Sequence, residues 1–264
     1  MTLHTRPAAV AGRFYPADAA ALREAVDRYI AQGHLSAQAG RPKAIIGPHA
    51  GYRYSGPIAG SAYAALASLR GSIRRVVLLG PAHYVGFPGI AVSGADAFAT
   101  PLGDVPVDHA ACQALQALPF VHSFDAAHTP EHGLEVHLPF LLQTLGEFAL
   151  VPLLFGRTNA GEAAQALDAV WGGDETLIVI SSDLSHYHDY ATAQLMDQAT
   201  ARFIEALDGG AIHADHACGR IAIQGLLKLA AARGLHAVTL DLRNSGDTAG
   251  PREEVVGYGA WLFA

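Results

Sequence analysis

The sequence Ala-Ile-Ile-Gly-Pro-His at residues 44–49 is a short apolar run that ends in glycine, proline and histidine. The same pattern returns at residues 76–83, Val-Val-Leu-Leu-Gly-Pro-Ala-His. A third run, residues 177–180, leads through Ser-Ser-Asp-Leu-Ser to His186, and a fourth, residues 150–155, ends at Gly156. Short apolar runs bounded by glycine and proline are typical of buried strands in an α/β sheet.

Three of these strand ends carry side chains that can bind metals or protons, namely His49, His83 and the pair Asp183 and His186. In open α/β sheets, ligands bind beyond the carboxyl ends of the strands, so these residues are expected to meet at one edge. Imidazoles gathered there would build a metal site or an acid–base site. Two loop histidines satisfied by backbone hydrogen bonds are the alternative, and the repeated pattern favours the functional interpretation.

The remaining sequence predicts helices between the strands. The expected fold is a single α/β domain spanning residues 1–264, with a mixed, mostly parallel sheet and helices on both faces. Strands are expected at residues 43–47, 75–80, 149–155, 176–181, 236–242 and 255–263, with a hairpin within residues 90–107. Helices are expected at residues 18–31, 57–69, 109–118, 131–145, 160–171, 189–208 and 214–233.

Composition narrows the class of protein. Apolar residues make up 51% of the 264-residue chain, which is enough for a large core, and the net charge is −7. A small acidic excess without a basic cluster argues against a nucleic-acid partner or an anionic membrane surface. Residues 1–7 contain no apolar leader, and no apolar run is long enough to span a membrane, so we expect a soluble, cytoplasmic protein. Two cysteines indicate a reducing compartment.

The two cysteines differ in their surroundings. Cys112 lies in an alanine-rich predicted helix and is interpreted as a core thiol. Cys218 is expected near the start of a helix and close to Arg220, a setting that lowers a thiol pKa. A thiolate there would be a metal ligand, and the alternatives are an inert buried thiol or a nucleophile.

Asp183 and His186 are three residues apart in the turn that leaves a predicted strand. In one interpretation both face a cavity, where His186 acts as general base and Asp183 as ligand or orienting group. In the other, Asp183 caps the following helix and His186 is merely exposed.

The segment Glu-His-Gly-Leu-Glu-Val-His at residues 131–137 is dense in ligand-type side chains. On a helix, His132 and His137 would be about 140° apart and could not share a metal from one face. His132 and Glu135 could share a face and form part of a pocket wall, or this could be an acidic first helical turn. The sequence assigns no firm role to any of the three.

Several common sites are excluded. The chain contains no phosphate-binding G-x-x-x-x-G-K-[ST] motif and no strand-linked G-x-G-x-x-G, which argues against nucleotide cofactors. It contains no C-x-x-C, which excludes common structural zinc and iron–sulfur sites.

Taken together, the ordered motifs resemble the Memo family, whose prokaryotic members are called AmmeMemoRadiSam system protein B. The motifs that carry this resemblance are residues 11–16, 48–52, 54–56, 80–83, 131–139, 181–187, 218–219, 244–248 and 256–259. The resemblance implies a fold similar to the class III extradiol ring-cleaving dioxygenases, which use non-haem iron. It covers nearly the whole chain.

The resemblance also implies residue roles. It places His49, His83 and Cys218 as metal ligands, His186 as the base, with Asp183 beside it, and Phe14 where eukaryotic relatives have tryptophan. The cofactor is expected to be a divalent or redox metal ion, iron or copper, with zinc as a further option. Two histidines and a carboxylate suit Fe(II), whereas a thiolate softens the site towards copper or zinc.

Two functions follow from these expectations. The first is metal-dependent redox chemistry on a small molecule, with His186 moving protons. The second is a binding module that holds a peptide, a phosphorylated ligand or a metal in the same pocket without turnover. A cysteine hydrolase that uses Cys218 is a third interpretation, and metal content would distinguish among them. The substrate, the native metal and the oligomeric state are left open.

Overall fold

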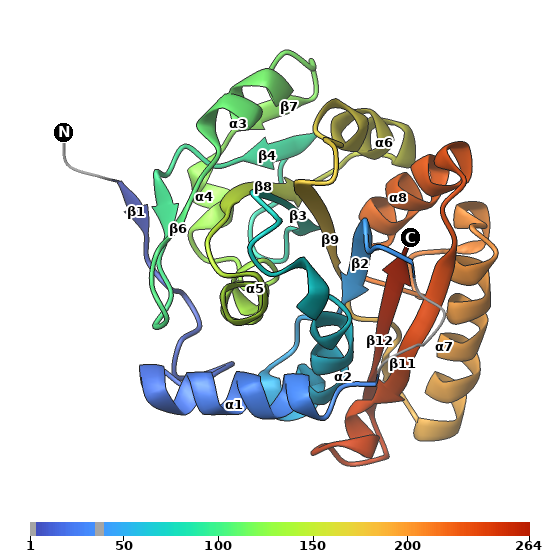
Figure 1. Ribbon diagram of the computed structural model, residues 1–264. Coiled ribbons are helices and arrows are strands. Elements are labelled where there is room, and N and C mark those ends of the chain that lie inside the picture. The colour runs from blue at the N-terminus through green and yellow to red at the C-terminus, as the bar shows by residue number, and fades with distance from the viewer. Residues whose placement is uncertain (1–3, 35–39) are drawn as a thin grey trace.

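A mixed β-sheet runs through the middle of the computed structural model, which describes residues 4–34 and 40–264 (Figure 1). The strand order is β10-β12-β2-β9-β3-β8-β4-β7, and β11 pairs with β12. The strands are β2 (Ala44–Gly47), β3 (Arg75–Pro81), β4 (Ile90–Val92), β7 (Val121–Ser123), β8 (Ala149–Phe155), β9 (Thr176–Ser181), β10 (His186–His188), β11 (Ala237–Asn244) and β12 (Val255–Phe263).

The centre of this sheet is parallel. Strand β9 pairs in parallel with β2 and β3, and β3 pairs in parallel with β8, whereas β10, β11 and β12 add antiparallel pairs. Every residue of β2 and β9 is buried, which explains their unbroken apolar sequences. The register sets Gly47 opposite Ser181 and Leu79 opposite Ile180. The chain therefore leaves all three strands at one edge of the sheet.

Helices cover both faces of the sheet, as the sequence predicts. On one side α1 (Ala19–Ala31), α2 (Tyr52–Ala64) and α5 (Leu138–Leu145) pack together. On the other lie α3 (His109–Leu115), α6 (Ala160–Ala169), α7 (Tyr190–Glu205) and α8 (Arg220–Arg233), as Figure 1 shows. A short helix α4 (Asp125–His128) and single turns η1 (Ala67–Leu69), η2 (Glu135–His137), η3 (Gly209–Ala211) and η4 (Ser245–Asp247) complete the helical elements.

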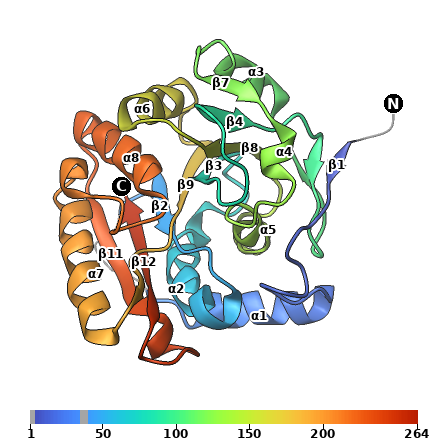
Figure 2. The ribbon, with the colours of Figure 1, turned by 180° about the vertical axis from the view of Figure 1, so that it is seen from behind.

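A small second sheet lies at the far end of the molecule from α7 (Figure 2). It consists of β1 (Thr5–Arg6), β5 (Ala97–Phe98) and β6 (Val105–Pro106), and the antiparallel pairing of β5 with β6 confirms the predicted hairpin. In the described part of the chain, no helix is long and apolar enough to cross a bilayer. The first three residues of the stretch predicted to hold no leader lie outside the described residues.

Three helix starts differ from the predictions. Helix α2 begins at Tyr52, so Pro57 lies inside it and not in its first turn. Burial of the Tyr52 ring, whose hydroxyl donates to the carbonyl of Val136, outweighs the one backbone bond that Pro57 removes. Helix α8 begins at Arg220, after Cys218, and residues 131–134 form a turn ahead of η2. In both segments, glycine and polar contacts with other strands replace the helical hydrogen bonds.

Candidate metal centre

His49 follows β2 and is almost completely buried. Its Nδ1 lies 2.7 Å from the Ser181 hydroxyl at the end of β9, and that hydroxyl donates to the carbonyl of Gly133 at 2.6 Å. Burial, reinforced by neighbouring histidines, holds the pKa of His49 well below its ordinary value. The ring is therefore neutral at pH 7 and available as a ligand.

His83 follows β3 and is fixed by a single carboxylate. Glu131 accepts the backbone N–H of His83 at 2.7 Å through Oε2, and its Oε1 lies 2.8 Å from Nδ1 of the same residue. Burial raises the pKa of Glu131, but hydrogen bonds from His83 and Gly133 outweigh it and leave the pKa below its ordinary value. Glu131 is therefore ionised beside the His83 ring.

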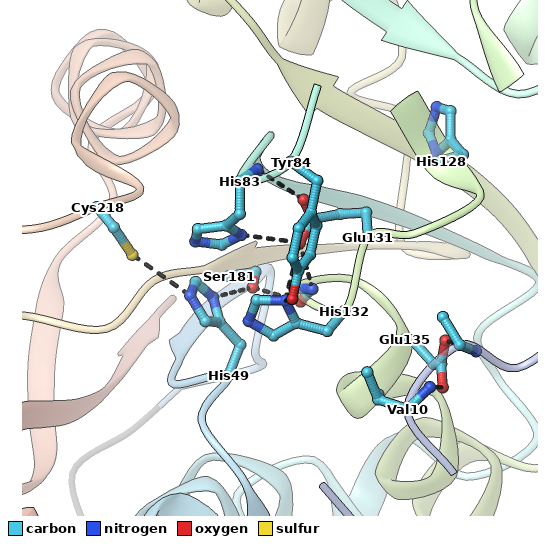
Figure 3. Close-up of polar contacts among 12 residues, drawn as sticks. Val10, His49, His83, Tyr84, His128, Glu131, His132, Glu135, Ser181 and Cys218 are labelled. Atoms are coloured by element: carbon cyan, nitrogen blue, oxygen red, sulfur yellow. Dashed lines mark hydrogen bonds and ion pairs between the residues drawn. The ribbon is translucent and has the colours of Figure 1, made fainter. Parts of the chain in front are cut away.

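His49, His83 and His132 form a cluster that could hold a metal ion. Their ligand nitrogens all lie within 4.8 Å of one another. The rings of His49 and His83 are nearly perpendicular, with centroids 5.0 Å apart, while His83 and His132 stack at 4.6 Å. Figure 3 shows the three rings gathered at the ends of β2 and β3 and in the turn that carries His132.

Cys218 approaches this cluster from the other side (Figure 3). Its Sγ lies 3.4 Å from Nε2 of His49 and 3.6 Å from the carbonyl of Asp183. Gly219 allows this approach, because a Cβ there would lie 2.6 Å from the carbonyl oxygen of Ser181. The segment before α8 can thus press directly against the end of β9.

The expected depression of the Cys218 pKa is wrong. Burial, and secondly the charge of Asp183, raise the pKa of this thiol to about 12. The residue precedes the N-cap Gly219 and so does not lie in the first turn of α8. Burial also raises the pKa of Cys112 to about 12, and Cys112 is the core thiol that the sequence predicts.

Asp183 is buried and does not cap a helix. Its Oδ1 accepts the backbone N–H of His49 at 2.7 Å, and its Oδ2 lies 3.9 Å from Nε2 of the same histidine. Burial raises the pKa of Asp183 to about 7. The chain then continues into β10, and Asp189 caps α7 instead.

His186 lies in β10, outside the nitrogen cluster but in the wall of the same cavity. Burial lowers its pKa, so the imidazole is neutral at pH 7. The cavity measures about 480 Å³. Half of the lining residues carry aromatic or histidine rings, namely Phe14, His49, Tyr54, His83, His132, His186, Tyr187 and Tyr258. Asp183 and Glu254 add two carboxyl groups, and the other lining residues are small or apolar.

A second cavity, of about 340 Å³, lies on the other side of His186. It is lined by His186, His188, Ala214, Asp215 and Cys218. The two cavities share His186, and Cys218 lines only the second. One cavity therefore reaches the cluster at its histidines, and the other reaches it at the Cys218 thiol.

Comparison with known proteins shows the family of this chain. A family model described as Memo-like protein matches residues 6–262. The chain belongs to the Memo family. It is 33% identical over 273 residues to a MEMO1 family protein of Aquifex aeolicus, covering 99% of this chain and 100% of the relative. It is also 33% identical to one from Methanopyrus kandleri, with 98% of each chain covered, and 34% identical to one from Thermotoga neapolitana, with 96% and 97% covered.

The residues of the ligand-rich segment 131–137 of this Memo-family chain have different surroundings. His132 lines the cavity, which is one of the two roles that the sequence left open for it. Glu135 does not: it pairs with Arg6 and accepts from the hydroxyl of Tyr15. It also accepts from the backbone N–H of Val10, as Figure 3 shows, so it anchors the N-terminal segment. His137 is buried and contacts the hydroxyl of Tyr63 through Nδ1. His132 and Glu135 do not share a helix face, which was one of the alternatives, because residues 131–134 are not helical.

Two residues that the sequence did not single out hold the histidines of this Memo-family site, namely Glu131 and Ser181. A carboxylate directly before His132 was a visible signal for Glu131. Ser181 ends β9, but its place beside His49 depends on the parallel pairing of β9 with β2. Only the assembled sheet brings that hydroxyl to the ring.

Proposed function

We propose that this Memo-family protein binds one metal ion through His49, His83 and Cys218 and uses it for redox chemistry on a small molecule. The observation that carries the proposal is the arrangement of donor atoms. Nδ1 of each histidine is engaged by the protein, so Nε2 is the nitrogen left to bind a metal. The Sγ of Cys218 lies 3.4 Å from Nε2 of His49.

The chemistry of these side chains suits such an ion. Two imidazoles and one cysteine make a donor set that suits copper, zinc or iron. His132 is the competing third ligand, because its nitrogen lies in the same cluster. Its ring is tilted by only 29° from the ring of His83, and lone pairs of near-parallel stacked rings run side by side and do not converge. That geometry favours Cys218 as the third ligand.

A bound redox metal would supply electron transfer and Lewis-acid polarisation of a substrate. The protein itself supplies the rest. His186, neutral in the cavity wall, accepts a proton from a ligand, and Asp183 holds the backbone of His49 in place. We extend the proposal to dioxygenase-like chemistry, in line with the resemblance of these motifs to the class III extradiol enzymes.

The cavity favours a small, flat ligand. A volume of about 480 Å³ suits a drug-sized molecule, and the rings of Phe14, Tyr54 and Tyr258 offer apolar contact. None of the described lining residues is lysine or arginine. Tight recognition of phosphate usually relies on those side chains, so the lining argues for an uncharged or cationic ligand.

A non-catalytic binding module is the second candidate, and the cavity rim favours it. Tyr187 is 73% exposed, and its φ of 60° lies in the left-handed region, which is rare for a residue with a side chain. Tyr84 is also exposed, and its hydroxyl lies 3.2 Å from Nδ1 of His132. Two exposed tyrosines near the histidine cluster are suited to contact with a peptide.

Metal content separates the two functions. The protein is purified without a histidine tag, analysed for iron, copper and zinc, and followed by absorption spectroscopy on exposure to oxygen. About one metal per chain with a spectral change supports the redox enzyme. Protein that neither retains nor takes up metal, yet binds a ligand in the cavity, overturns it in favour of the binding module.

A further inference from the structure

The turn formed by Glu131, His132 and Gly133 is linked to both histidines at the strand ends, directly to His83 and through Ser181 to His49. Glu131 binds His83, and it also accepts the backbone N–H of Gly133 at 2.8 Å. The carbonyl of Gly133 in turn accepts from Ser181, which contacts His49. One short turn therefore reaches the ring nitrogens of two residues that come from different strands (Figure 3).

The direction of each hydrogen bond at His83 follows from the chemistry of its partner. An ionised carboxylate can only accept, so the Nδ1 that lies 2.8 Å from Oε1 of Glu131 must carry the hydrogen. Oε2 of Glu131 accepts the backbone N–H of His83. Because the Glu131 carboxylate binds both the ring and the backbone N–H of His83, the His83 ring cannot rotate freely. With one hydrogen on the ring, that hydrogen is on Nδ1 and Nε2 is the bare nitrogen.

The same reasoning applies at His49 through one more bond. A carbonyl can only accept, so the Ser181 hydroxyl directs its hydrogen to Gly133. That hydroxyl must then accept from Nδ1 of His49, which lies 2.7 Å away. Nε2 of His49 is left unprotonated, facing the thiol of Cys218.

We propose that the Glu131–Gly133 turn is a positioning device that sets the tautomer of both His49 and His83 before a metal ion arrives. The proposal rests on the metal site proposed above. A histidine ligand must present a bare nitrogen, and the hydrogen bond made by its other nitrogen selects which one is bare. Gly133 is suited to this place, because a Cβ there would lie 3.2 Å from Oε1 of Glu131, the oxygen that faces the His83 ring.

The test is Glu131→Gln, with Zn²⁺ as the probe. Glutamine keeps one acceptor oxygen and sets an NH₂ group against N–H donors of His83. In metal-free protein, long-range ¹H–¹⁵N NMR reports which nitrogen of each ring is protonated. We expect wild type to show Nδ1–H for both rings and Glu131→Gln to lose that preference at His83. Zn²⁺ affinity is expected to fall about 10–100-fold, as for other groups that orient metal-binding histidines.

Ser181→Ala provides the second arm. It removes the acceptor for Nδ1–H of His49 and should change the tautomer of His49 while leaving His83 unchanged. This variant keeps the proposal testable if Glu131→Gln fails to fold. Glu135→Gln is the matched control, because Glu135 is an equally buried glutamate on the same segment whose partners include Arg6, Tyr15 and the backbone of Val10. It should lower thermal stability and leave both tautomers and Zn²⁺ affinity unchanged.

The outcomes also separate this inference from the proposed function. Unchanged tautomers and unchanged Zn²⁺ affinity in folded Glu131→Gln and Ser181→Ala would overturn the inference. Wild-type protein that takes up no metal, yet shows the expected tautomers and their loss in the variants, would overturn the proposed function and leave the positioning role standing.

Discussion

The carboxylate of Asp183 binds the backbone of His49 and not its ring, with 2.7 Å between Oδ1 and the amide nitrogen. This bond ties the loop after β9 to the loop after β2, so the position of one candidate ligand depends on a side chain 134 residues away. The same carboxylate is buried and carries a pKa raised to about 7. Its protonation therefore affects the stability of the whole edge of the sheet.

Asp183→Asn should stabilise metal-free protein at high pH. In an unfolded chain the aspartate pKa is about 3.9, so between that value and about 7 the unfolded state loses a proton that the folded state keeps. Wild-type stability therefore falls as pH rises through this window and levels off above it. Asparagine does not titrate, so the variant avoids this loss of stability. Its side-chain oxygen can still accept the backbone N–H of His49.

The advantage of Asp183→Asn should grow from near zero at pH 4 to at most about 4 kcal/mol at pH 8. Urea unfolding of metal-free wild type and variant at several pH values measures it. Asp18→Asn is a control, since Asp18 is an exposed helix cap whose side chain accepts from Ala21. A difference between wild type and Asp183→Asn that does not vary with pH would contradict the prediction.

Single alanine variants should separate ligands from the base. His49→Ala, His83→Ala and Cys218→Ala should lose stoichiometric metal, because each removes a donor atom. His186→Ala should keep metal and lose turnover by about 10²–10⁴-fold, the usual contribution of a general base. Metal titration followed by elemental analysis measures the loss of metal, and a turnover assay measures the loss of activity.

Three further variants complete this series. His122→Ala is a control, since His122 lies in β7 beside Phe87 and Phe124 and does not line the main cavity. His132→Ala decides between the two candidate third ligands, and Asp183→Asn shows whether that carboxylate is a ligand or an orienting group. Loss of metal in His186→Ala with retention in Cys218→Ala would show that the ligand assignment is wrong.

Metal affinity should rise with pH. The thiol of Cys218, with its pKa raised to about 12, is protonated at neutral pH, so a metal must displace that proton. His49 has a lowered pKa, is already neutral and adds no dependence there. Apparent affinity should thus increase about tenfold per pH unit from pH 7 to 9.

Competition titrations with a chelator of known pH dependence measure this slope. Calorimetry in buffers of different ionisation enthalpy counts the released proton directly. Cys218→Ala should bind the metal more weakly, and its affinity should not increase with pH. A wild-type affinity that is flat over this range would mean that the thiol does not bind the metal.

Alkylation should distinguish the two cysteines by access. The pKa of each is raised to about 12, so thiolate content does not separate them. Cys218 lines a cavity of about 340 Å³, whereas Cys112 is buried in the core. Iodoacetamide should modify Cys218 faster, and bound metal should protect it, as measured by peptide mass spectrometry.

Ala214→Trp, which narrows that cavity, should slow alkylation of Cys218. Ala20→Trp, at an exposed alanine of α1 that does not line this cavity, is the matched control and should leave the rate unchanged. Equal rates for the two cysteines in wild type would show that this cavity does not admit the reagent.

Local sequence predicted most of the strands because burial of a strand requires an unbroken apolar run. Residues 176–181 were expected as a strand and are β9, and the run before His83 is β3. Helix starts were less predictable. Tyr52 begins α2 ahead of Pro57, and Cys218 lies outside α8, because contacts with distant strands decided where helical hydrogen bonding could start.

The sequence by itself determined most of the strands, the resemblance to the Memo family and the histidines at the ends of β2 and β3, because strand pattern and motif order are properties of neighbouring residues. Only the tertiary structure decided what surrounds those histidines. Burial sets the pKa of Cys218 to about 12, against the local expectation. Glu131 turns towards His83 while Glu135 turns towards Arg6, although both belong to one acidic segment. Desolvation and hydrogen-bond direction depend on atoms brought together from distant parts of the chain, and no local pattern encodes them.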